Sequence, residues 1–396
     1  MILSCALALA AEGDLSGYAE LQARYSHGVE GTPWFLLERL RPTLEIEPDP
    51  RMRVVVSPQL ALPQGRYDLE EGVTLLNDQA GAILDLAGCD LSVPDRIDTV
   101  HDVLTLERFY VDVYTPRADV RVGRQALNWG SALFFNPTNL FAQVLLTEPW
   151  KERQGVNALR VTVPFDRHQV VAVAALDDDL ENARVAVKPT VNLLATDLSL
   201  LASWRTGDDL PVLGWDVRGT LGVGFWVEGR TALDEPAPFV SAGLDYSFPI
   251  LDRAYLALQY TYDGTGLAPE DYSLEARGGG VATLECENVD APEASEPRFT
   301  LGRHYALGTL SFSNWEVLSA GATVLVNLED GSAFLMPTLG WTPGAAWSIN
   351  AGAQIPLGEG ELSPGPALTT IDDPVELDFS GLVPEWTAFT YVRFAL

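Results

Sequence analysis

Apolar residues alternate with small or polar residues in segments of about ten residues along most of the chain. In 240–248, Val240 and Leu244 share one face of an extended strand, and Ser241 and Asp245 share the other. A strand that crosses a bilayer needs about 9–11 residues and shows this period of two. The same alternation recurs in 212–221, 254–262 and 318–326.

The alternating segments predict about 18 strands, with 16 as the alternative. Their connections are long on one side, at 64–99, 130–154, 264–299 and 357–383, and short on the other. A β-sandwich has no reason to sort its loops in this way, whereas a membrane barrel has long extracellular loops and short periplasmic turns. We therefore expect an all-β fold, a closed antiparallel transmembrane β-barrel, with both termini on the periplasmic side. The strands are expected at 15–26, 34–47, 51–63, 100–114, 118–129, 155–164, 167–176, 183–191, 197–206, 212–221, 224–232, 238–248, 252–263, 300–312, 315–327, 332–342, 346–356 and 384–396.

Aromatic residues gather near the ends of these strands, where an amphipathic ring suits the level of the lipid head groups. The chain ends with apolar residues at alternate positions, Val392, Phe394 and Leu396. This ending resembles the C-terminal strand signal that the barrel-assembly machinery recognises, with Leu in place of the usual final Phe. The tryptophans near strand ends are Trp34, Trp204, Trp315, Trp341, Trp347 and Trp386.

The first residues resemble a secretory signal. An apolar run over 2–9 leads into Ala8-Leu9-Ala10, which suits a cleavage site, although a positive leading region is missing. We assign 1–11 to a signal-peptide remnant and 12–396 to a single barrel domain. Cys5 would leave with the signal. Cys89 and Cys286 then remain, one in each of two long loops, and they either pair as a disulfide or stay as thiols.

The formal net charge of −30 argues against a nucleic-acid partner, which needs clustered Lys and Arg. Three long segments, 65–98, 264–299 and 357–383, carry a net −6 each. These segments are either solvated loop faces or sites where divalent cations bridge to anionic lipopolysaccharide. The sequence does not separate the two.

One motif stands out, Arg121-Val-Gly-Arg-Gln-Ala-Leu-Asn-Trp-Gly130, followed by Phe134-Phe-Asn-Pro137. Over about 105–165 the chain resembles large outer-membrane channels, including the alginate-export-like and related porin-like barrels, which carry a similar strand leading into a long loop. The resemblance implies a channel in the outer membrane of a Gram-negative bacterium, and it does not imply a particular solute.

Strand parity places Arg121, Gly123 and Gln125 on one face, which we expect to line the lumen. The same parity turns Arg124 toward lipid, a costly position near the membrane midplane. Either a bulge at Gly123, which would bring Arg124 into the lumen as well, or a position near the membrane interface would resolve this conflict.

The loop after this strand is a candidate constriction. Asn136-Pro137 suits the start of a helix, and apolar residues then recur at helical spacing, so we expect a short helix over 137–146. The loop either folds into the barrel and narrows it or caps the mouth from outside. The residues assigned to the constriction are Asn136, Pro137, Phe141, Glu148, Lys151 and Arg153.

The lumen-facing positions carry many arginines. They either form a neutralised ladder of ion pairs that braces the wall or a field that selects solutes by charge. The sign of selectivity stays open, because arginine walls favour anions and the acidic loops oppose their entry. The residues assigned to the pore lining are Arg24, Arg39, Arg41, Arg53, Arg121, Arg124, Gln125, Arg160, Arg184, Asp216, Arg218, Glu228, Arg230 and Arg393.

No motif for a metal, nucleotide or hydrolase site is present in the sequence, so we expect no enzyme activity and no cofactor. The expected function is passage of small polar solutes, in contact with outer-membrane lipid and lipopolysaccharide, as a monomer or a trimer. The alternatives are a loop-plugged barrel that acts as a surface receptor or adhesin, and a barrel hydrolase.

Overall fold

The protein is described by a computed structural model over 13–28, 34–64, 89–92, 104–141, 154–176, 182–207, 210–233, 236–248, 254–269, 272, 283–286, 300–315, 317–363 and 385–396. Eighteen strands in these ranges form one antiparallel sheet. They are β1 (Asp14–His27), β2 (Trp34–Asp49), β3 (Met52–Gln64), β5 (Leu104–Tyr114), β6 (Asp119–Gln125), β7 (Val156–Phe165), β8 (His168–Leu176), β9 (Ala183–Leu193), β10 (Thr196–Arg205), β11 (Val212–Thr220), β12 (Gly224–Ala232), β13 (Phe239–Phe248), β14 (Ala254–Asp263), β16 (His304–Trp315), β17 (Leu318–Asn327), β18 (Ala333–Gly344), β19 (Trp347–Leu357) and β20 (Trp386–Ala395).

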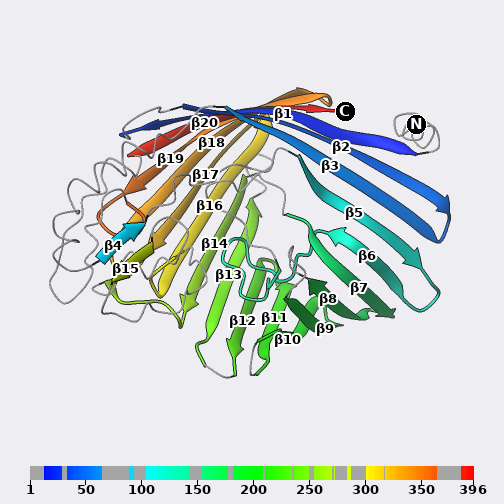
Figure 1. The fold of residues 1–396 in the computed structure, drawn as a ribbon. Coiled ribbons are helices and arrows are strands. Elements are labelled where there is room, and N and C mark those ends of the chain that lie inside the picture. The colour runs from blue at the N-terminus through cyan, green and yellow to red at the C-terminus, as the bar shows by residue number, and fades with distance from the viewer. Residues whose placement is uncertain are drawn as a thin grey trace.

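Each strand pairs with its neighbours in the chain, and β1 also pairs with β20, so the sheet closes into a barrel. Figure 1 shows the strands around a common interior, with the chain that follows β6 lying inside it. A second, two-stranded sheet pairs β4 (Cys89–Ser92) with β15 (Thr283–Cys286). The closed antiparallel barrel predicted from the sequence is confirmed. The part of the chain described here contains no helix that could span a membrane.

The expected strand bounds differ most at β6 and β16. The sequence predicted a strand over 118–129, whereas β6 ends at Gln125 because the chain turns into the barrel there. The expected strand over 300–312 lies at His304–Trp315. Residues 300–303 instead form hydrogen bonds with loops at the outer end of the barrel.

The side chains are arranged inside out compared with a soluble protein. Large apolar residues on the strands are exposed, such as Leu200 at 66%, Leu244 at 55% and Leu339 at 65%. Polar residues on the opposite strand faces are buried, including Gln259 and Thr261. This pattern is typical of a wall that presents its apolar face to lipid and its polar face to the lumen.

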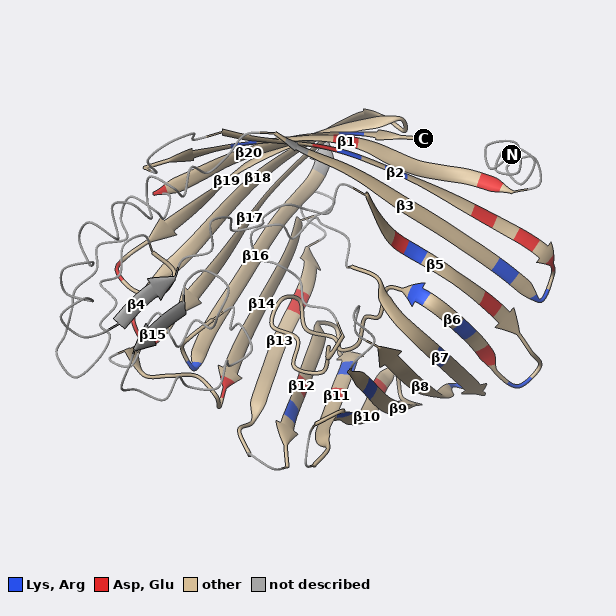
Figure 2. Ribbon diagram, in the orientation of Figure 1, with Lys and Arg blue, Asp and Glu red and all other residues tan. Residues whose placement is uncertain are grey.

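Charged residues occupy only part of the wall. The four strands β16, β17, β18 and β19 contain no Asp, Glu, Lys or Arg. Figure 2 shows the strand charges concentrated on β1–β3, β5–β7 and β9–β12. The lumen therefore has one charged wall and one wall of small and uncharged residues.

The closure between β1 and β20 is held by a buried ion-pair network. The carboxylate of Glu20 is fully buried and accepts hydrogen bonds from Arg39 at 2.6 Å and from Arg393 at 2.7 Å. Because Glu20 faces Arg39 on β2 and Arg393 on β20, one acid joins three neighbouring strands.

Replacing Glu20 with alanine is expected to weaken the closure. The change leaves Arg39 buried without its acid, which costs about 3 kcal/mol of folding free energy. The midpoint of the heat-induced mobility shift on denaturing gels should therefore fall. Glu47→Ala, which removes an exposed acid from β2, serves as the control and should leave the midpoint unchanged. Equal midpoints for both variants would contradict the assignment.

Candidate pore constriction

The chain leaves the wall after Gln125 and lies inside the barrel over 126–141, a segment we call the inner loop. Gln125 is fully buried, and its side-chain amide donates to the carbonyl oxygen of Ala158 at 2.9 Å. Leu127 and Trp129 pack in a cluster with Ala158 and the inner-face residues of β8, β9 and β10. The first part of the inner loop is therefore fixed by apolar contacts on the wall next to β6.

The middle of the inner loop is fastened to β12 by one buried carboxylate. Glu228 accepts hydrogen bonds from the backbone N–H of Ser131 at 3.3 Å and of Ala132 at 3.1 Å, and from the Thr138 hydroxyl at 2.6 Å. Its side chain has no exposed surface. These donors lie far from Glu228 in sequence, so the carboxylate sets the path of the loop.

The next two strands hold the loop tip. The backbone N–H of Leu133 donates to Gln259 on β14 at 2.8 Å. The carbonyl oxygen of Phe135 accepts from Ser241 on β13 at 2.7 Å and from Gln259 at 3.1 Å. The loop's backbone groups thus bond to wall side chains and need no helix to satisfy them.

Gly130 is required by this path. Its φ is +89°, and a Cβ would lie 2.0 Å from Asn136 Oδ1 and 2.4 Å from Glu228 Oε2. Only glycine suits both the backbone conformation and the close approach. The Trp-Gly pair of the motif therefore has two roles, because Trp129 packs on the wall and Gly130 lets the chain turn toward Glu228.

The loop that the sequence offered as a candidate constriction lies inside the barrel over 126–141, and the predicted helix is wrong over 137–141. Residues 136–141 form turns and irregular structure. Asn136 and Pro137 lie in this stretch, and Phe141 packs edge-on against Trp129 at 5.0 Å. Residues 142–146 of the expected helix, and Glu148, Lys151 and Arg153, lie outside the described residues.

The tip of the inner loop also contacts the uncharged wall. The ring of Phe135 lies 5.1 Å from that of Tyr305 on β16, in a cluster with Leu325 and the partly buried Leu362. Leu362 belongs to the segment after β19, on the long-loop side of the barrel. The inner loop therefore shares packing with an outer loop.

A buried acid holds that outer segment. Glu361 accepts from the Tyr305 hydroxyl, from the backbone N–H of Leu301 and from the Asn327 amide at 2.8 Å. Asn327 also donates to the Tyr272 hydroxyl at 2.9 Å. Burial raises the pKa of Tyr272 to about 12, so this phenol stays protonated at neutral pH.

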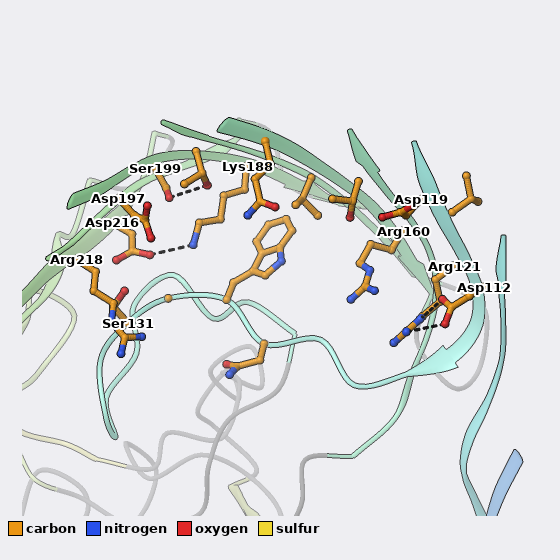
Figure 3. A pocket seen from close by; sticks show the side chains of 18 of the residues that line it. Asp112, Asp119, Arg121, Ser131, Arg160, Lys188, Asp197, Ser199, Asp216 and Arg218 are labelled. Atoms are coloured by element: carbon orange, nitrogen blue, oxygen red, sulfur yellow. Dashed lines mark hydrogen bonds and ion pairs between the residues drawn. The ribbon is translucent and has the colours of Figure 1, made fainter. Parts of the chain in front are cut away.

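A cavity of about 590 Å³ lies between the inner loop and the charged wall. Its lining comes mainly from strand segments near the short turns, together with Asn128–Ser131 of the inner loop. Figure 3 shows the charged side chains around this space. Four acids and four bases line it, namely Asp112, Asp119, Asp197, Asp216, Arg121, Arg160, Lys188 and Arg218.

Three of these charged residues, Asp112, Arg121 and Arg160, form one row across neighbouring strands with Arg53. In register, Arg53 faces Asp112, Asp112 faces Arg121, and Arg121 faces Arg160. Asp112 accepts from Arg121 at 2.6 Å and from Arg53 at 3.1 Å. Arg53 also bonds Glu45 at 2.9 Å. The row together with Glu45 therefore holds three arginines against two acids.

Arg160 stands at the end of this row. It makes no hydrogen bond or ion pair with any residue that the structure describes. Its next neighbour in register is Val173. Figure 3 shows its guanidinium directed into the cavity. A second ion pair, between Lys188 and Asp216 at 2.9 Å, lies on the other side, next to the exposed Arg218.

The structure divides the remaining expected pore residues into two groups. Arg39 and Arg41 are buried, at 4% and 5% exposure, and their partners are Glu20 and Ser57. These two brace the wall and do not line open space. The inner strand faces also carry Arg24, Arg184, Arg230 and Arg393, and Arg230 lies over the ring of Phe239.

Arg124 differs from the expectation. The pairing of β5 with β6 runs without a shift through Tyr110 with Gly123 and Phe109 with Arg124. The expected bulge at Gly123 is therefore absent, and Arg124 keeps the parity of Val122. Phe109 opposite it is 51% exposed, as expected for the lipid-facing side.

Sequence reasoning missed Asp112, Lys188, Thr138 and Ser241. Asp112 stands between Val111 and Val113, and an acid flanked by apolar residues in a strand is a signal that could have identified it. Thr138 and Ser241 carry no such signal, because their roles depend on where the inner loop meets the wall.

No protein-family model matches the chain. No curated protein matches it by sequence. Among solved structures it is similar to OccAB1 of Acinetobacter baumannii, with a TM-score of 0.54, 11% identity and coverage of 97% of this chain and 96% of that one. It is also similar to Pseudomonas aeruginosa OccK11 (OpdR), with a TM-score of 0.54, 8% identity and coverage of 98% and 96%. A third is Wzi of Escherichia coli, described as a carbohydrate-binding β-barrel involved in capsule assembly, with a TM-score of 0.51, 8% identity and coverage of 99% and 86%.

These neighbours are outer-membrane β-barrels, and at such low identity the likeness concerns the fold. The chain has the outer-membrane β-barrel fold, in agreement with the class and the outer-membrane location expected from the sequence.

Proposed function

We propose that this barrel is a porin-like channel through which small polar solutes cross the outer membrane past the inner loop. The observation that carries the proposal is the inner loop itself. It is fastened inside the barrel to Glu228, Gln259 and Ser241, and it borders a polar cavity of about 590 Å³. A loop held in the lumen next to charged walls provides both a size limit and an electrostatic filter.

The arrangement of charge supports passage of ions and polar molecules. The cavity lining is balanced between acids and bases, and Arg160 and Arg218 make no ion pair with the described residues. A permeating solute meets cationic groups that are not already neutralised by a carboxylate. The opposite wall, β16–β19, presents uncharged groups. Solutes with both a charged end and hydroxyl groups suit such a lumen.

Recording from planar lipid bilayers tests the proposal. The purified full chain should produce stepwise conductance in potassium chloride, and protein that has been heat-unfolded before addition should not. Liposomes loaded with the protein should also swell in isotonic solutions of small sugars or amino acids. A folded barrel that gives neither conductance nor swelling would refute the channel and favour the loop-plugged receptor.

The receptor alternative has one observation in its favour. The inner loop contacts β7–β10 and β12 of the charged wall, β13 and β14 beside it, and β16 of the uncharged wall, and an outer segment packs on its tip. Sugar binding without conductance, measured by isothermal titration with capsule-type oligosaccharides, is the result that this alternative expects.

A further inference from the structure

Two neighbouring turns at the short-turn end of the barrel present leucine side chains. Leu194 lies in the turn between β9 and β10 and is 95% exposed, and Leu221 lies in the turn between β11 and β12 and is 80% exposed. In register, Thr196 on β10 faces Gly219 on β11. Leu194 is two residues before the first of these positions and Leu221 is two residues after the second, so the two turn tips lie side by side.

The first of these turns holds leucine in a backbone conformation that it rarely adopts. Leu193 pairs with Thr196, so the turn has two central residues, Leu194 with φ +50° and Ala195 with φ +63°. A two-residue turn with positive φ at both positions normally carries Asn and Gly, because a bulky side chain is costly there. An Asn-Gly turn would connect the same strands at lower cost. The leucine therefore indicates a role for its side chain outside the turn itself.

The apolar surface of the two turns continues the lipid-facing surface of the strands. On β10 that surface reaches the turn through Leu198, and on β9 it ends in Leu193, and both side chains are exposed. Val223 extends it beside the second turn. No Asp, Glu, Lys or Arg occurs in 191–196 or in 219–225. A continuous apolar surface that is exposed in this way marks a site of contact with membrane or protein.

Other short turns of the barrel carry charge at their tips. The turn between β7 and β8 also has two central residues, and these are Asp166 and Arg167. Asp166 has φ +58°, which an aspartate tolerates better than a leucine does. Arg51 lies in the turn between β2 and β3, and Arg117 in the turn between β5 and β6. Charged tips suit water and head groups, so β9–β12 form a sector of different chemistry at the same end of the barrel.

We propose that the tips of these two turns insert into the inner leaflet of the outer membrane and anchor the β9–β12 sector in phospholipid. Phospholipid is the occupant because the apolar surface of the turns is continuous with the surface that already meets lipid. The leucine side chains reach the boundary between head groups and hydrocarbon, where their apolar surface leaves water. That gain offsets the strained conformation of Leu194. The turns of β9–β12 therefore lie deeper in the membrane than the charged turns do. This proposal does not depend on channel activity.

A fluorescent probe at the turn tips tests the depth. Leu194→Cys, Leu221→Cys and Asp166→Cys are made separately in a full-length chain in which Ser replaces each native cysteine, namely Cys5, Cys89 and Cys286. Each variant is labelled with bimane and reconstituted into phosphatidylcholine vesicles with iodide on both sides. At positions 194 and 221 we expect blue-shifted emission that brominated lipid quenches more strongly than iodide does, and at 166 the reverse. Equal and strong quenching by iodide at all three positions would overturn the proposal and favour a periplasmic protein as the occupant.

A second test keeps the native cysteines. Leu194→Asn gives the turn a residue that it prefers, so turn chemistry alone predicts a higher midpoint of unfolding by guanidinium chloride. Insertion into lipid predicts the opposite, a lower midpoint for protein folded in vesicles, and Leu221→Asn should act in the same direction. Asp166→Asn, at the equivalent position of the charged turn, is the control and should not lower the midpoint. An unchanged or raised midpoint for Leu194→Asn would refute the anchor.

Discussion

Glu228→Ala is expected to release the inner loop and to raise the single-channel conductance. The substitution removes the acceptor of three hydrogen bonds, from Ser131, Ala132 and Thr138. Donors left buried without a partner cost about 1–3 kcal/mol each, so the loop should lose its fixed position before the wall unfolds. We expect larger and noisier current steps in planar bilayers and a lower midpoint in the heat-induced mobility shift.

Asp245→Ala is the matched control for this variant. Asp245 lies on the adjacent strand β13, and its contact is the Tyr255 hydroxyl at 3.1 Å, not the inner loop. Its removal should leave conductance near the parent value. Gln259→Leu provides a second test, because it removes the anchor of Leu133 and one of the two anchors of Phe135, and it should act in the same direction as Glu228→Ala. Unchanged conductance in both anchor variants would show that the loop does not limit the pore.

The second large effect is expected at the charged row. Arg160→Gln removes a cation that points into the cavity and has no ion-pair partner among the described residues, so it should alter selectivity with little effect on stability. One charge near a permeating ion contributes about 1 kcal/mol at 4 Å in water, which corresponds to roughly a fivefold change in relative ion occupancy. The reversal potential in a salt gradient should therefore move toward cation selectivity.

Asp112→Asn should shift the same reversal potential in the opposite direction. It leaves Arg53 and Arg121 without the acid that joins them, and it should also lower stability. Arg117→Gln, in the exposed turn between β5 and β6, is the control, because it changes the net charge as Arg160→Gln does and is expected to cause no shift. If Arg160→Gln and Asp112→Asn both kept the parent reversal potential, as the control should, the row would have no role in selectivity.

The barrel could be predicted because its evidence is local. Alternation within a segment such as 240–248 reports which face meets lipid, and loop lengths report which end faces the periplasm. Both signals are independent of which strands pair. The strand positions therefore agree closely with the structure, and the largest errors lie at the end of β6, where the chain leaves the wall, and at the start of β16.

The sequence predicted which charged residues face the lumen, but it did not predict which of them contact one another. Parity placed Arg39 and Arg121 on the inner face, and the register then separated them. Arg39 is buried against Glu20, whereas Arg121 shares Asp112 at the edge of the cavity. The partner of a side chain on the neighbouring strand depends on the register of the two strands. Alternation along a single strand gives no information on that register.

Alternation, loop lengths and charge in the sequence by themselves determined the barrel, its orientation and the polarity of its interior. Only the tertiary structure decided that 126–141 runs to Glu228, and that Arg160 ends the row with no ion-pair partner among the residues that the structure describes. The physical reason is that each of these features joins groups far apart in the chain. Contacts between such groups depend on closure of the sheet and on packing inside the barrel, and a local sequence pattern predicts neither.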